Sequence, residues 1–473
     1  MNRLVLFLAL FAFSYGKAQT YNSLNISLLS HINPNGSTVT PGWAGNWYSG
    51  CWGWFQSSTN KEYAIIGASN GTYFIDVSAP GSPSVSAFVP GKTGCTWREI
   101  KTYQNYCYVV SDDASPNTFQ IIDMSPLPST VSLVYNDKTL FERGHTIWID
   151  QNKMYIGGMT NSVSTFPMAV YSLATPTAPV LLRELSQDVP SNLISYVHDM
   201  YVRNDTVFAS AAYQGLYVLK FNSSTNTFSV LGAYQSYSAS SYNHSSFLTQ
   251  NGKYLMFCDE VPAGQPIRLV DVQNLSNIQP IKTFQPAPKT TPHNPYIIGN
   301  NFALVSCYHD GLFIYNISNP NLVSLAGYFD TFPQGGFQQD NYSGYQGNWG
   351  AYPFLPSGIV IANDMQNGVF ILNANAAYTT NVVNPVGTAP INSLHQTLGL
   401  FPNPAQDAVH LSVPGSGEGR LQILNSLGAL VFEKSLEGKT ELDLDLQTYP
   451  QGLYHVLYLA NNGQFQQALL KSR

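Results

Sequence analysis

Short apolar runs recur along most of the chain, separated by turns that are rich in Asn, Gly, Ser and Pro. Examples are YAIIGAS, YCYVVSD, FALVSCY and GIVIAND, in which β-branched and aromatic residues dominate. Runs of this length and composition predict β-strands rather than helices. The strands come in groups of four, and each group occupies roughly 50 residues. This repeat predicts an all-β fold in which each group forms one blade of a β-propeller.

Each group opens with a Trp or a His at its first apolar run. The seven anchor residues are Trp52, Trp97, His145, His198, His244, His293 and Trp349. Seven anchors predict a seven-bladed propeller, but the seventh group, from Trp349, lacks a fourth strand. The unassigned run Leu24–Ile32 resembles the other fourth strands. We therefore expect this N-terminal strand to complete the last blade, so that the ring closes without an open sheet edge.

The remaining segments differ from the repeats in composition. Residues 1–18 combine a basic start, an apolar run and small residues at the end, which is typical of a secretory signal peptide. Residues 19–375 hold the predicted propeller, and residues 376–397, rich in Ala, Asn, Thr and Pro, predict a linker. Residues 398–473 regain strand patterning and predict a small β-sandwich. No segment of the mature chain is apolar enough to predict a transmembrane helix.

Composition narrows the range of partners. Charged residues form 10% of the chain, aromatic residues form 13%, and the formal net charge is −6. The scarcity of Lys and Arg argues against a nucleic-acid partner. Loops such as 235–243 and 330–348 are rich in Tyr, Ser, Gly, Asn and Gln, a mixture that suits recognition of a glycan or a peptide. Surface loops of weakly charged secreted proteins often share this composition, so both interpretations stay open.

Five cysteines follow the predicted signal peptide, namely Cys51, Cys95, Cys107, Cys258 and Cys307. No two of them form a CxxC pair, which argues against a zinc knuckle or a thioredoxin-type site. Export to an oxidising compartment permits a disulfide, and Cys51–Cys95 is the first candidate pair. The odd count leaves at least one free thiol, for which a buried apolar position is expected.

The anchors are the main candidates for chemistry. Because each anchor opens an innermost strand, we expect all seven to ring one mouth of the central channel and to bind ligand there. The candidate metal ligands are His145, His198, His244, His293, Asp199, Asp259 and Asp310. Further acids expected on the same face are Glu99, Asp112, Asp113, Glu260 and Asp364. Imidazole with carboxylate binds divalent metals such as Zn²⁺, Mn²⁺ or Fe²⁺, and it also suits acid–base catalysis.

A purely structural role for the anchors competes with this hypothesis. Trp, which cannot bind a metal, occupies the anchor position in three groups. The shared requirement is then a flat ring with an N–H donor, which can hydrogen-bond the neighbouring blade. A second repeated feature is an acid late in the third strand, as at Asp76, Asp123 and Asp271. We expect these acids to stabilise their blades by hydrogen bonds.

The propeller region resembles a known family. The segments EYAIIGASNGTYFIDVSAP and NWGAYPFLPSGIVIANDMQNGVFIL, together with the histidine-anchored strands, closely resemble the choice-of-anchor B family. Members are secreted bacterial proteins with LVIVD-type propeller repeats, and the resemblance covers roughly residues 21 to 372. It implies a propeller at the cell surface. The family supplies no catalytic residue set.

The tail resembles the type A C-terminal sorting domain of type IX secretion. The matching residues are Pro402, Asn403, Pro404, Gly428, Pro450, Gly452, Tyr454, Lys471 and Arg473. The tail ends in LLKSR, a small departure from the KLxK-like end. The resemblance implies a Bacteroidota-type host, export by the type IX secretion machinery and removal of the tail. The protein would then be released or attached to lipopolysaccharide at the outer cell surface.

Three hypotheses for function follow from these patterns. The first is a secreted or surface-attached module that recognises a glycan or a protein. The second is a metal-dependent hydrolase or lyase that acts on polysaccharide through the anchor histidines and nearby acids. The third is a scaffold for another envelope protein. The chain contains no GxSxG motif, Walker loop or strand-linked GxGxxG motif, so no standard nucleophile or nucleotide site competes with them.

Overall fold

The computed structural model describes residues 20–34, 40–113, 116–237, 240–339, 345–379, 398–413, 417–425, 430–460 and 463–472. The predicted signal peptide, residues 1–18, lies outside the described residues, as do residues 380–397 of the predicted linker. The chain divides into two compact units, Met1–Gly387 and Thr388–Arg473. In the part of the chain that is described, no helix is long and apolar enough to cross a membrane.

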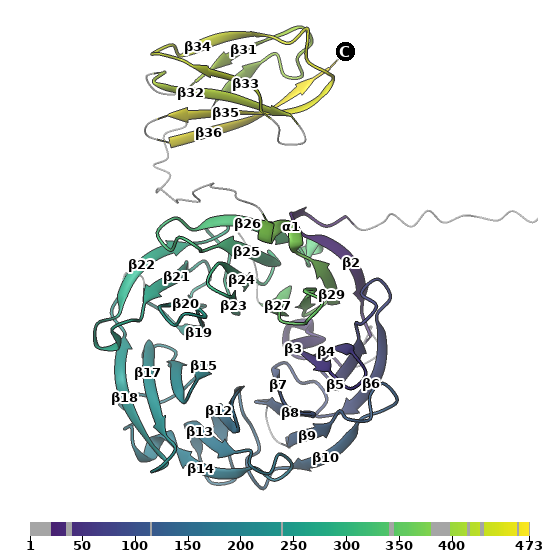
Figure 1. Ribbon diagram of the computed structural model, residues 1–473, viewed down its shortest axis with the longest axis vertical. Helices are drawn as coiled ribbons and strands as arrows, with labels where there is room; N and C mark the ends of the chain where they lie inside the picture. Colours follow the sequence, from purple (N-terminus) through teal and green to yellow (C-terminus); the bar gives the residue numbers. More distant parts are fainter. Residues whose placement is uncertain are drawn as a thin grey trace, which may run out of the picture. The chain divides into compact units, whose positions relative to one another are not determined.

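Seven antiparallel sheets form a ring in the first unit (Figure 1). The first three are β3 (Tyr48–Gln56), β4 (Lys61–Ala68), β5 (Gly71–Asp76) and β6 (Ser84–Pro90); β7 (Arg98–Tyr103), β8 (Tyr106–Ser111), β9 (Phe119–Asp123) and β10 (Ser132–Asp137); and β11 (Thr146–Asp150), β12 (Lys153–Thr160), β13 (Thr165–Ser172) and β14 (Val180–Glu184). The fourth and fifth are β15 (Asp199–Arg203), β16 (Thr206–Ser210), β17 (Leu216–Asn222) and β18 (Thr227–Tyr234); and β19 (Asn243–Leu248), β20 (Tyr254–Asp259), β21 (Ile267–Asp271) and β22 (Gln279–Phe284). In each sheet the chain starts at the centre of the ring and moves outward, as in a propeller blade.

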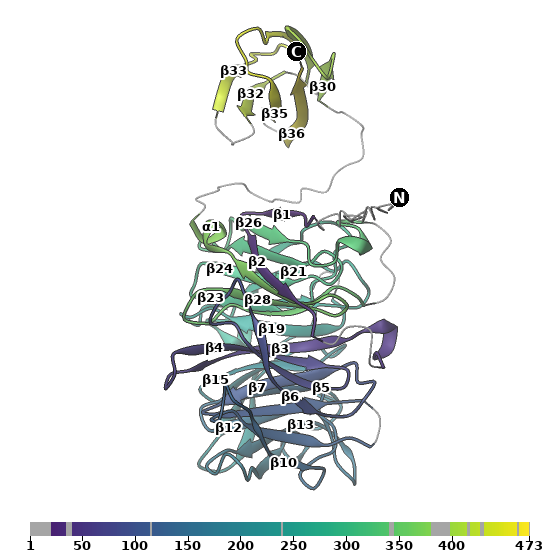
Figure 2. The same ribbon diagram turned by 90° about the vertical axis from the view of Figure 1, so that its right-hand side faces the viewer.

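The last two sheets recruit the N-terminal segment. The sixth holds β23 (Pro295–Ile298), β24 (Phe302–Ser306), β25 (Leu312–Asn316) and β26 (Ser324–Phe329), and the seventh holds β27 (Asn348–Tyr352), β28 (Val360–Asp364) and β29 (Gly368–Asn373). Strand β2 (Ser27–Ile32) pairs antiparallel with β29 and supplies the missing fourth strand, which confirms the predicted closure. The sequence did not predict β1 (Ser23–Leu24), which adds a fifth strand beside β26. Figure 2 shows both N-terminal strands beside these sheets.

The ring is held together by apolar side chains between neighbouring sheets. Phe141, for example, is fully buried between the second and third sheets. Its ring lies 4.7 Å from that of Phe119 and 5.6 Å from that of Tyr171. Because the middle strands are covered on both faces, their apolar runs are continuous rather than alternating, which explains runs such as YAIIGAS.

Short irregular elements connect the strands. The 3₁₀ helices are η1 (Trp43–Gly45), η2 (Leu185–Gln187), η3 (Leu275–Asn277) and η4 (Pro333–Gly335). Helix α1 (Asn375–Thr379) lies at the start of the segment predicted as a linker. It packs on the sixth sheet, where Ala377 is buried and the ring of Tyr378 lies 5.2 Å from that of Phe302. Residues 376–379 therefore extend the core of the first unit.

The repeated acids have the expected structural role. Asp76, Asp123 and Asp271 each accept a hydrogen bond from the backbone amide two residues later, at 2.8 to 2.9 Å. Each one therefore stabilises the turn that follows the third strand of its sheet. In the sixth and seventh sheets a glycine stands at or just before the start of the third strand. Gly311 and Gly368 have φ values of 81° and 89°, which favour glycine over other residues.

The disulfide predicted between Cys51 and Cys95 is not formed. All five cysteines are buried free thiols. Cys51 lies within β3, whereas the Cys95 thiol contacts the Asp113 carboxylate, with 2.8 Å between Sγ and Oδ2. The two side chains therefore pack in different environments, as small apolar fillers.

A buried carboxyl group at the end of β28 makes the stability of the ring depend on pH. Burial raises the pKa of Asp364 to about 7, although hydrogen bonds from Thr331, Gln366 and Asn367 partly oppose this. The pKa of an unfolded Asp is about 3.9. Between these values the folded state binds the proton more tightly, so this group lowers the free energy of unfolding as the pH rises.

We therefore expect Asp364→Asn to gain stability over the native protein as the pH rises. The difference in unfolding free energy should grow by about 3 kcal/mol between pH 4 and pH 8, measured by urea denaturation. Asp137→Asn is the control, because hydrogen bonds from Thr139 lower the pKa of the exposed Asp137 and predict a difference of opposite sign. A pH-independent difference for Asp364→Asn would contradict the burial argument.

The second unit consists of two sheets that share one core. One sheet is β30 (Gly399–Phe401), β31 (Ala408–Ser412) and β34 (Glu441–Asp445), and the other is β33 (Leu430–Ser435), β32 (Gly419–Asn425), β35 (Gly452–Ala460) and β36 (Gly463–Lys471). Leu411, Leu421 and Val456 belong to a single apolar cluster with residues from both sheets. This arrangement confirms the predicted small β-sandwich.

Candidate functional site

Six of the seven anchors meet at one end of the ring. From Trp97 round to Trp349, each anchor ring contacts the next one along the chain. The centroid distances are 6.5 Å from Trp97 to His145, 4.2 Å to His198, 4.2 Å to His244, 4.3 Å to His293 and 4.5 Å to Trp349. The four histidines, here called the histidine arc, therefore form one continuous stack across four neighbouring sheets.

Trp52 is placed elsewhere. It lies in the middle of β3, which begins four residues earlier, whereas the other anchors lie within one or two residues of a strand start. Its ring instead contacts Tyr352 at 4.8 Å and Trp148 at 6.2 Å. The sequence pattern CWGWF therefore placed the anchor of the first sheet at the wrong residue. In this sheet the innermost strand begins four residues before Trp52, whereas in the other sheets it begins within two residues of the anchor.

Backbone hydrogen bonds hold the imidazoles of the arc. Nδ1 of His198 donates to the carbonyl of His244 at 3.0 Å, and Nδ1 of His293 donates to the carbonyl of Trp349 at 2.6 Å. These bonds join each inner strand to the next, which supports the structural role considered for the anchors. They also make Nε2 of each of these two rings the nitrogen that carries the lone pair, although Nε2 of His198 lies 2.8 Å from Nε2 of His145. The structural role and a ligand role are therefore compatible in the same side chain.

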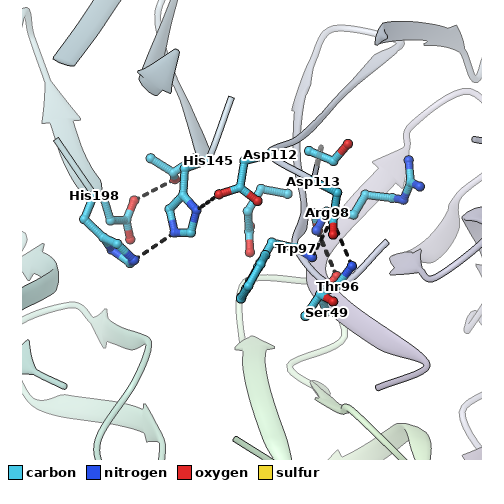
Figure 3. A network of polar contacts seen from close by, with 12 residues as sticks. Ser49, Thr96, Trp97, Arg98, Asp112, Asp113, His145 and His198 are labelled. Carbon is cyan, nitrogen blue, oxygen red and sulfur yellow. Dashed lines mark hydrogen bonds and ion pairs between the residues drawn. The ribbon is translucent and has the colours of Figure 1, made fainter. Parts of the chain in front are cut away.

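Two carboxylates reach the arc. Asp112 accepts a hydrogen bond from Nδ1 of His145, and Nε2 of His145 lies 2.8 Å from Nε2 of His198 (Figure 3). Oε2 of Glu260 lies 3.8 Å from Nε2 of His244. The other carboxylate oxygen of Glu260 accepts a hydrogen bond of 2.6 Å from the Tyr308 hydroxyl. One acid therefore lies at His145, the first histidine of the arc, and another lies beside His244.

Burial and neighbouring charges give the four imidazoles of the arc different pKa values. Burial lowers the pKa of His198 and of His244 well below the usual value, and neighbouring histidines lower it further. Burial likewise lowers the pKa of His293 to about 3. His145 differs: burial favours its neutral form, but the Asp112 carboxylate outweighs burial and raises its pKa. At neutral pH the arc therefore combines neutral imidazoles with one ring that is ready to carry a proton.

Two of the predicted metal-binding acids do not reach the arc. Asp259 is fully buried in the fifth sheet, where it accepts a hydrogen bond of 3.0 Å from Tyr237 and lies 3.4 Å from Arg268. Asp310 is fully buried and accepts hydrogen bonds from Thr290 Oγ1 at 2.5 Å and from the backbone amide of Gln338 at 2.6 Å. Asp259 points into its sheet, because successive residues of an extended segment face opposite ways, whereas Asp310 lies in the turn that follows β24. Glu260, the residue after Asp259, takes the position at the arc.

A network around Asp113 holds Trp97 beside the arc. Oδ2 of Asp113 accepts hydrogen bonds from the backbone amides of Thr96 at 3.0 Å and Trp97 at 3.3 Å. The next amide, that of Arg98, donates to the Ser49 hydroxyl at 3.0 Å (Figure 3). Asp113 was expected among the acids on this face, and the structure gives it this supporting position.

The arc separates two cavities. The outer one, here called the mouth cavity, has a volume of about 290 Å³. Its walls are Trp97, Asp112, Tyr196, Tyr213, Tyr242, Glu260, Val261, Tyr308 and Tyr345, and its floor is His145, His198, His244, His293 and Trp349. The inner cavity, of about 40 Å³, lies on the other side of the same five residues. The arc is therefore both the floor of one space and the roof of the other.

The inner cavity encloses three charged groups. Glu99, Lys101 and Asp199 all line it. Nε1 of Trp349 donates to Glu99 at 2.9 Å, and Thr146 Oγ1 donates to Asp199 at 2.8 Å. Burial raises the pKa of both carboxyl groups, and the positive charge of Lys101 partly opposes the rise. Asp199, a predicted metal ligand, is therefore placed below the arc beside an ammonium group.

Aromatic rings surround Lys101. Its Nζ lies 4.3 Å from the centre of the Trp52 ring and 5.6 Å from that of Trp148. Tyr201 stacks 4.9 Å from Trp148, and Phe247 lies 4.6 Å from Tyr201. These rings form an aromatic layer beneath the arc, and Trp52 belongs to this layer. The sequence showed that aromatic residues recur in the inner strands. It did not show which of them lie in the arc and which lie in the layer beneath it.

One family model matches part of the chain. Residues 399–472 match the model of the secretion system C-terminal sorting domain. This match covers β30 to β36 and agrees with the resemblance of the tail to type IX sorting domains. The chain is therefore secreted across the outer membrane by type IX secretion, and its second unit interacts with that machinery. A comparison of the whole sequence with curated proteins gives no match.

Several solved structures share general features with the chain. PorZ from Porphyromonas gingivalis, a surface component of the type IX secretion system, is 10% identical with a TM-score of 0.39 over 87% of this chain. This chain spans 64% of the length of PorZ. The β-propeller domain of Cps50 from Myceliophteria thermophila is 13% identical, with a TM-score of 0.45 over 71% of this chain and 98% of its own. A proposed 6-phosphogluconolactonase from Bacteroides uniformis is 11% identical, with a TM-score of 0.47 over 84% of this chain and 98% of its own. Likeness at this level assigns no function.

Proposed function

We propose that the first unit is a recognition module that binds a glycan in its mouth cavity, at the cell surface or in the surrounding medium. We further propose that this unit is a choice-of-anchor B propeller. The ring of seven sheets and its N-terminal closing strand support the family proposal. The observation that carries the binding proposal is the combination of exposed aromatic walls with a polar floor in one cavity.

The walls offer rings of the kind that sugars stack on. The side chain of Tyr213 is 73% exposed, and its ring lies 5.0 Å from that of Tyr242. Trp43 does not line the cavity itself, but it is 53% exposed, stacks at 6.5 Å on Trp97 and lies 5.9 Å from Tyr345, so it extends the wall outward. Large exposed aromatic side chains in a cluster mark binding surfaces rather than ordinary surface. Their faces suit the apolar C–H faces of pyranose rings.

The walls of the mouth cavity also supply hydrogen-bond partners. Asp112 and Glu260 provide carboxylate oxygens, and Tyr308 and Tyr345 provide hydroxyl groups. A few fixed polar groups in an otherwise aromatic cavity are the usual basis of small-ligand specificity. The formal net charge of −6 and the low content of charged residues fit a neutral sugar better than a polyanion. A peptide ligand would instead be expected to require a longer groove.

The proposal is tested with a glycan array probed with the full chain, followed by calorimetry on the strongest ligand. We expect Tyr213→Ala and Trp43→Ala each to weaken binding by about tenfold, because each removes a stacking face worth about 1.4 kcal/mol. Phe401→Ala is the matched control, since Phe401 is 77% exposed but lies in the second unit, and its affinity should equal that of the native chain. An array without signal, or unchanged affinity in both variants, would contradict the proposal. Capture of an envelope protein alone would favour the scaffold hypothesis.

A metal-dependent hydrolase or lyase is the second candidate function. The chain of contacts from Asp112 through His145 to His198 favours it, because a carboxylate-oriented imidazole at a cavity floor suits proton transfer. Incubation of the full chain with its best-binding glycan tests this candidate by chromatography of the products. Cleavage that His145→Gln abolishes would support the enzyme, and an intact glycan would exclude it for that ligand.

A further inference from the structure

We propose that His198, His244 and Glu260 bind one transition-metal ion of the Zn²⁺ class at the floor of the mouth cavity. This site does not depend on the glycan proposal. In the part of the chain that the structure describes, these three residues form the one cluster whose candidate ligand atoms all lie within 4.8 Å of one another. All three side chains are buried. Compared with the sequence-predicted ligands, the set keeps His198 and His244, omits His145, His293 and the three aspartates, and adds Glu260.

The spacing suits an ion better than a hydrogen bond. Nε2 of His244 and Oε2 of Glu260 are 3.8 Å apart, which is too far for a direct hydrogen bond. Two ligand atoms on one tetrahedral Zn²⁺, each about 2.1 Å from the ion, lie about 3.4 Å apart. A shift of a few tenths of an ångström would therefore bring both atoms onto one ion. Imidazole nitrogens select Zn²⁺ and its neighbours over Ca²⁺ or Mg²⁺.

The supporting contacts orient the ligand atoms toward a common point. Nδ1 of His198 is held by the carbonyl of His244, so that Nε2 is the nitrogen left to bind. Tyr308 holds Oε1 of Glu260 and leaves Oε2 beside His244. Partners of this kind around the ligand residues fix the tautomer and the orientation of metal-binding side chains. These contacts therefore orient His198 and Glu260 before an ion binds, and binding would move Nε2 of His198 away from Nε2 of His145, 2.8 Å distant.

Two features of the arc are energetically unfavourable. His244 is only 3% exposed, and its Nδ1 is buried without a hydrogen bond of normal geometry. Beside it, Nε2 of His145 and Nε2 of His198 approach to 2.8 Å, while Nδ1 of each ring is already hydrogen-bonded. Two facing lone pairs at this distance repel each other unless a proton or a metal ion lies with them. A proton on His145 or a metal ion on Nε2 of His198 relieves the second penalty, whereas an ion on Nε2 of His244 leaves its Nδ1 without a partner.

Three protein ligands leave one position of a tetrahedral ion unfilled. His198, His244 and Glu260 all line the mouth cavity, so that position faces the cavity. Zinc sites with three protein ligands and one exchangeable position are open to water or a ligand hydroxyl, unlike closed structural sites. The ion would accordingly be reached through the cavity, and added metal should enter the folded protein.

The test uses the full chain without an affinity tag of histidines, stripped with chelator and dialysed against Zn²⁺ or Co²⁺. We expect one ion per chain by elemental analysis and, with Co²⁺, the strong visible absorption of a four-coordinate site. His244→Gln and Glu260→Gln should each weaken Zn²⁺ binding by about 100-fold or more. Because His244 is buried, Glu260→Gln gives an independent answer if His244→Gln does not fold.

His293→Gln is the matched control, since His293 is 2% exposed in the same arc but lies outside the three-residue cluster. It should keep one ion per chain with an affinity within about threefold of the native value, well below the loss expected for a ligand. The proposal is overturned if the native chain binds no stoichiometric metal, or if Glu260→Gln binds like the native chain. Glycan binding that persists in chelator leaves the proposed function intact, so the two proposals fail separately.

Discussion

Replacing Lys101 by alanine should destabilise the propeller by about 3 to 5 kcal/mol, the largest effect expected for a single substitution in this chain. Lys101 is 7% exposed, and its ammonium group lies 4.3 Å from the Trp52 ring and 5.6 Å from the Trp148 ring. Its charge also favours the ionised forms of Glu99 and Asp199 in the inner cavity. The substitution removes the cation from the aromatic layer and leaves two enclosed carboxyl groups without their counter-charge.

Comparison of Lys101→Ala with Lys101→Met separates the contribution of the charge to stability from that of packing. Lys101→Met keeps most of the side-chain volume against the two tryptophans, so the stability that this variant still loses measures the contribution of the charge. Without Lys101 the pKa values of Glu99 and Asp199 should rise further above their unfolded values. Stability due to a raised carboxyl pKa is fully present at low pH and is lost as the pH rises, so the deficit of Lys101→Met should be smaller at pH 5 than at pH 8.

Urea denaturation of the full chain measures both variants, and the exposed Lys138→Ala serves as a control that should change stability by less than about 0.5 kcal/mol. If Lys101→Ala unfolds with the same midpoint as Lys138→Ala, the inner cavity does not depend on this cation. A deficit of Lys101→Met that is equal at both pH values would show that packing, rather than charge, carries the effect.

The second large effect is expected on removal of the N-terminal strands. Deletion of residues 20–33 takes away β1 and β2 and exposes the edge of β29. It also removes Ile26, which is 4% exposed in the core shared by the sixth and seventh sheets, and the partly buried Tyr21 and Ile32. Burial of three such side chains accounts for about 4 to 6 kcal/mol, before the lost strand pairing is considered.

Thermal unfolding and size-exclusion chromatography measure this effect. The truncated chain should unfold at a lower temperature and should self-associate, because an unpaired edge strand is a template for pairing with another molecule. Leu29→Ala is the control within the same strand, since Leu29 is 38% exposed and faces outward. A truncated chain that remains monomeric with an unchanged melting temperature would show that three strands suffice for the last blade.

The contacts of the histidine arc are compatible with both interpretations of the anchors. The hydrogen bonds of His198 and His293 to the next inner strand are the structural links that the repeated position suggested. These links use Nδ1 only, and at the cavity floor Nε2 of His198 lies 2.8 Å from Nε2 of His145. Trp349 differs from the histidines because its ring has a single N–H, which donates a hydrogen bond to Glu99, and has no second nitrogen. A metal-binding role could therefore arise in the histidine part of the ring without loss of the structural role.

Much of the fold was predictable because burial acts on local patterns. Sheets covered on both faces require continuous apolar runs, and Phe141 and its neighbours show how completely those runs are used. The sequence contained one strand without a group, Leu24–Ile32, and one group without a fourth strand, the seventh. This match predicted that the two combine, and β2 pairs with β29 as expected. The tail followed from its own motif residues, all of which except Arg473 lie within the region matched by the sorting-domain model.

The site was only partly predictable, because it is made from residues in different blades. The sequence by itself determined seven repeats, their closure and a run of four histidines at equivalent positions, since each of these is a periodic property of one chain. Only the tertiary structure decided that Trp52 lies in the aromatic layer and that Glu260, rather than Asp259, reaches the arc. A one-residue change of register reverses the face of a side chain, and such a change leaves the apolar period of the sequence intact. Which side chains meet across the mouth is therefore decided by the packing of neighbouring sheets.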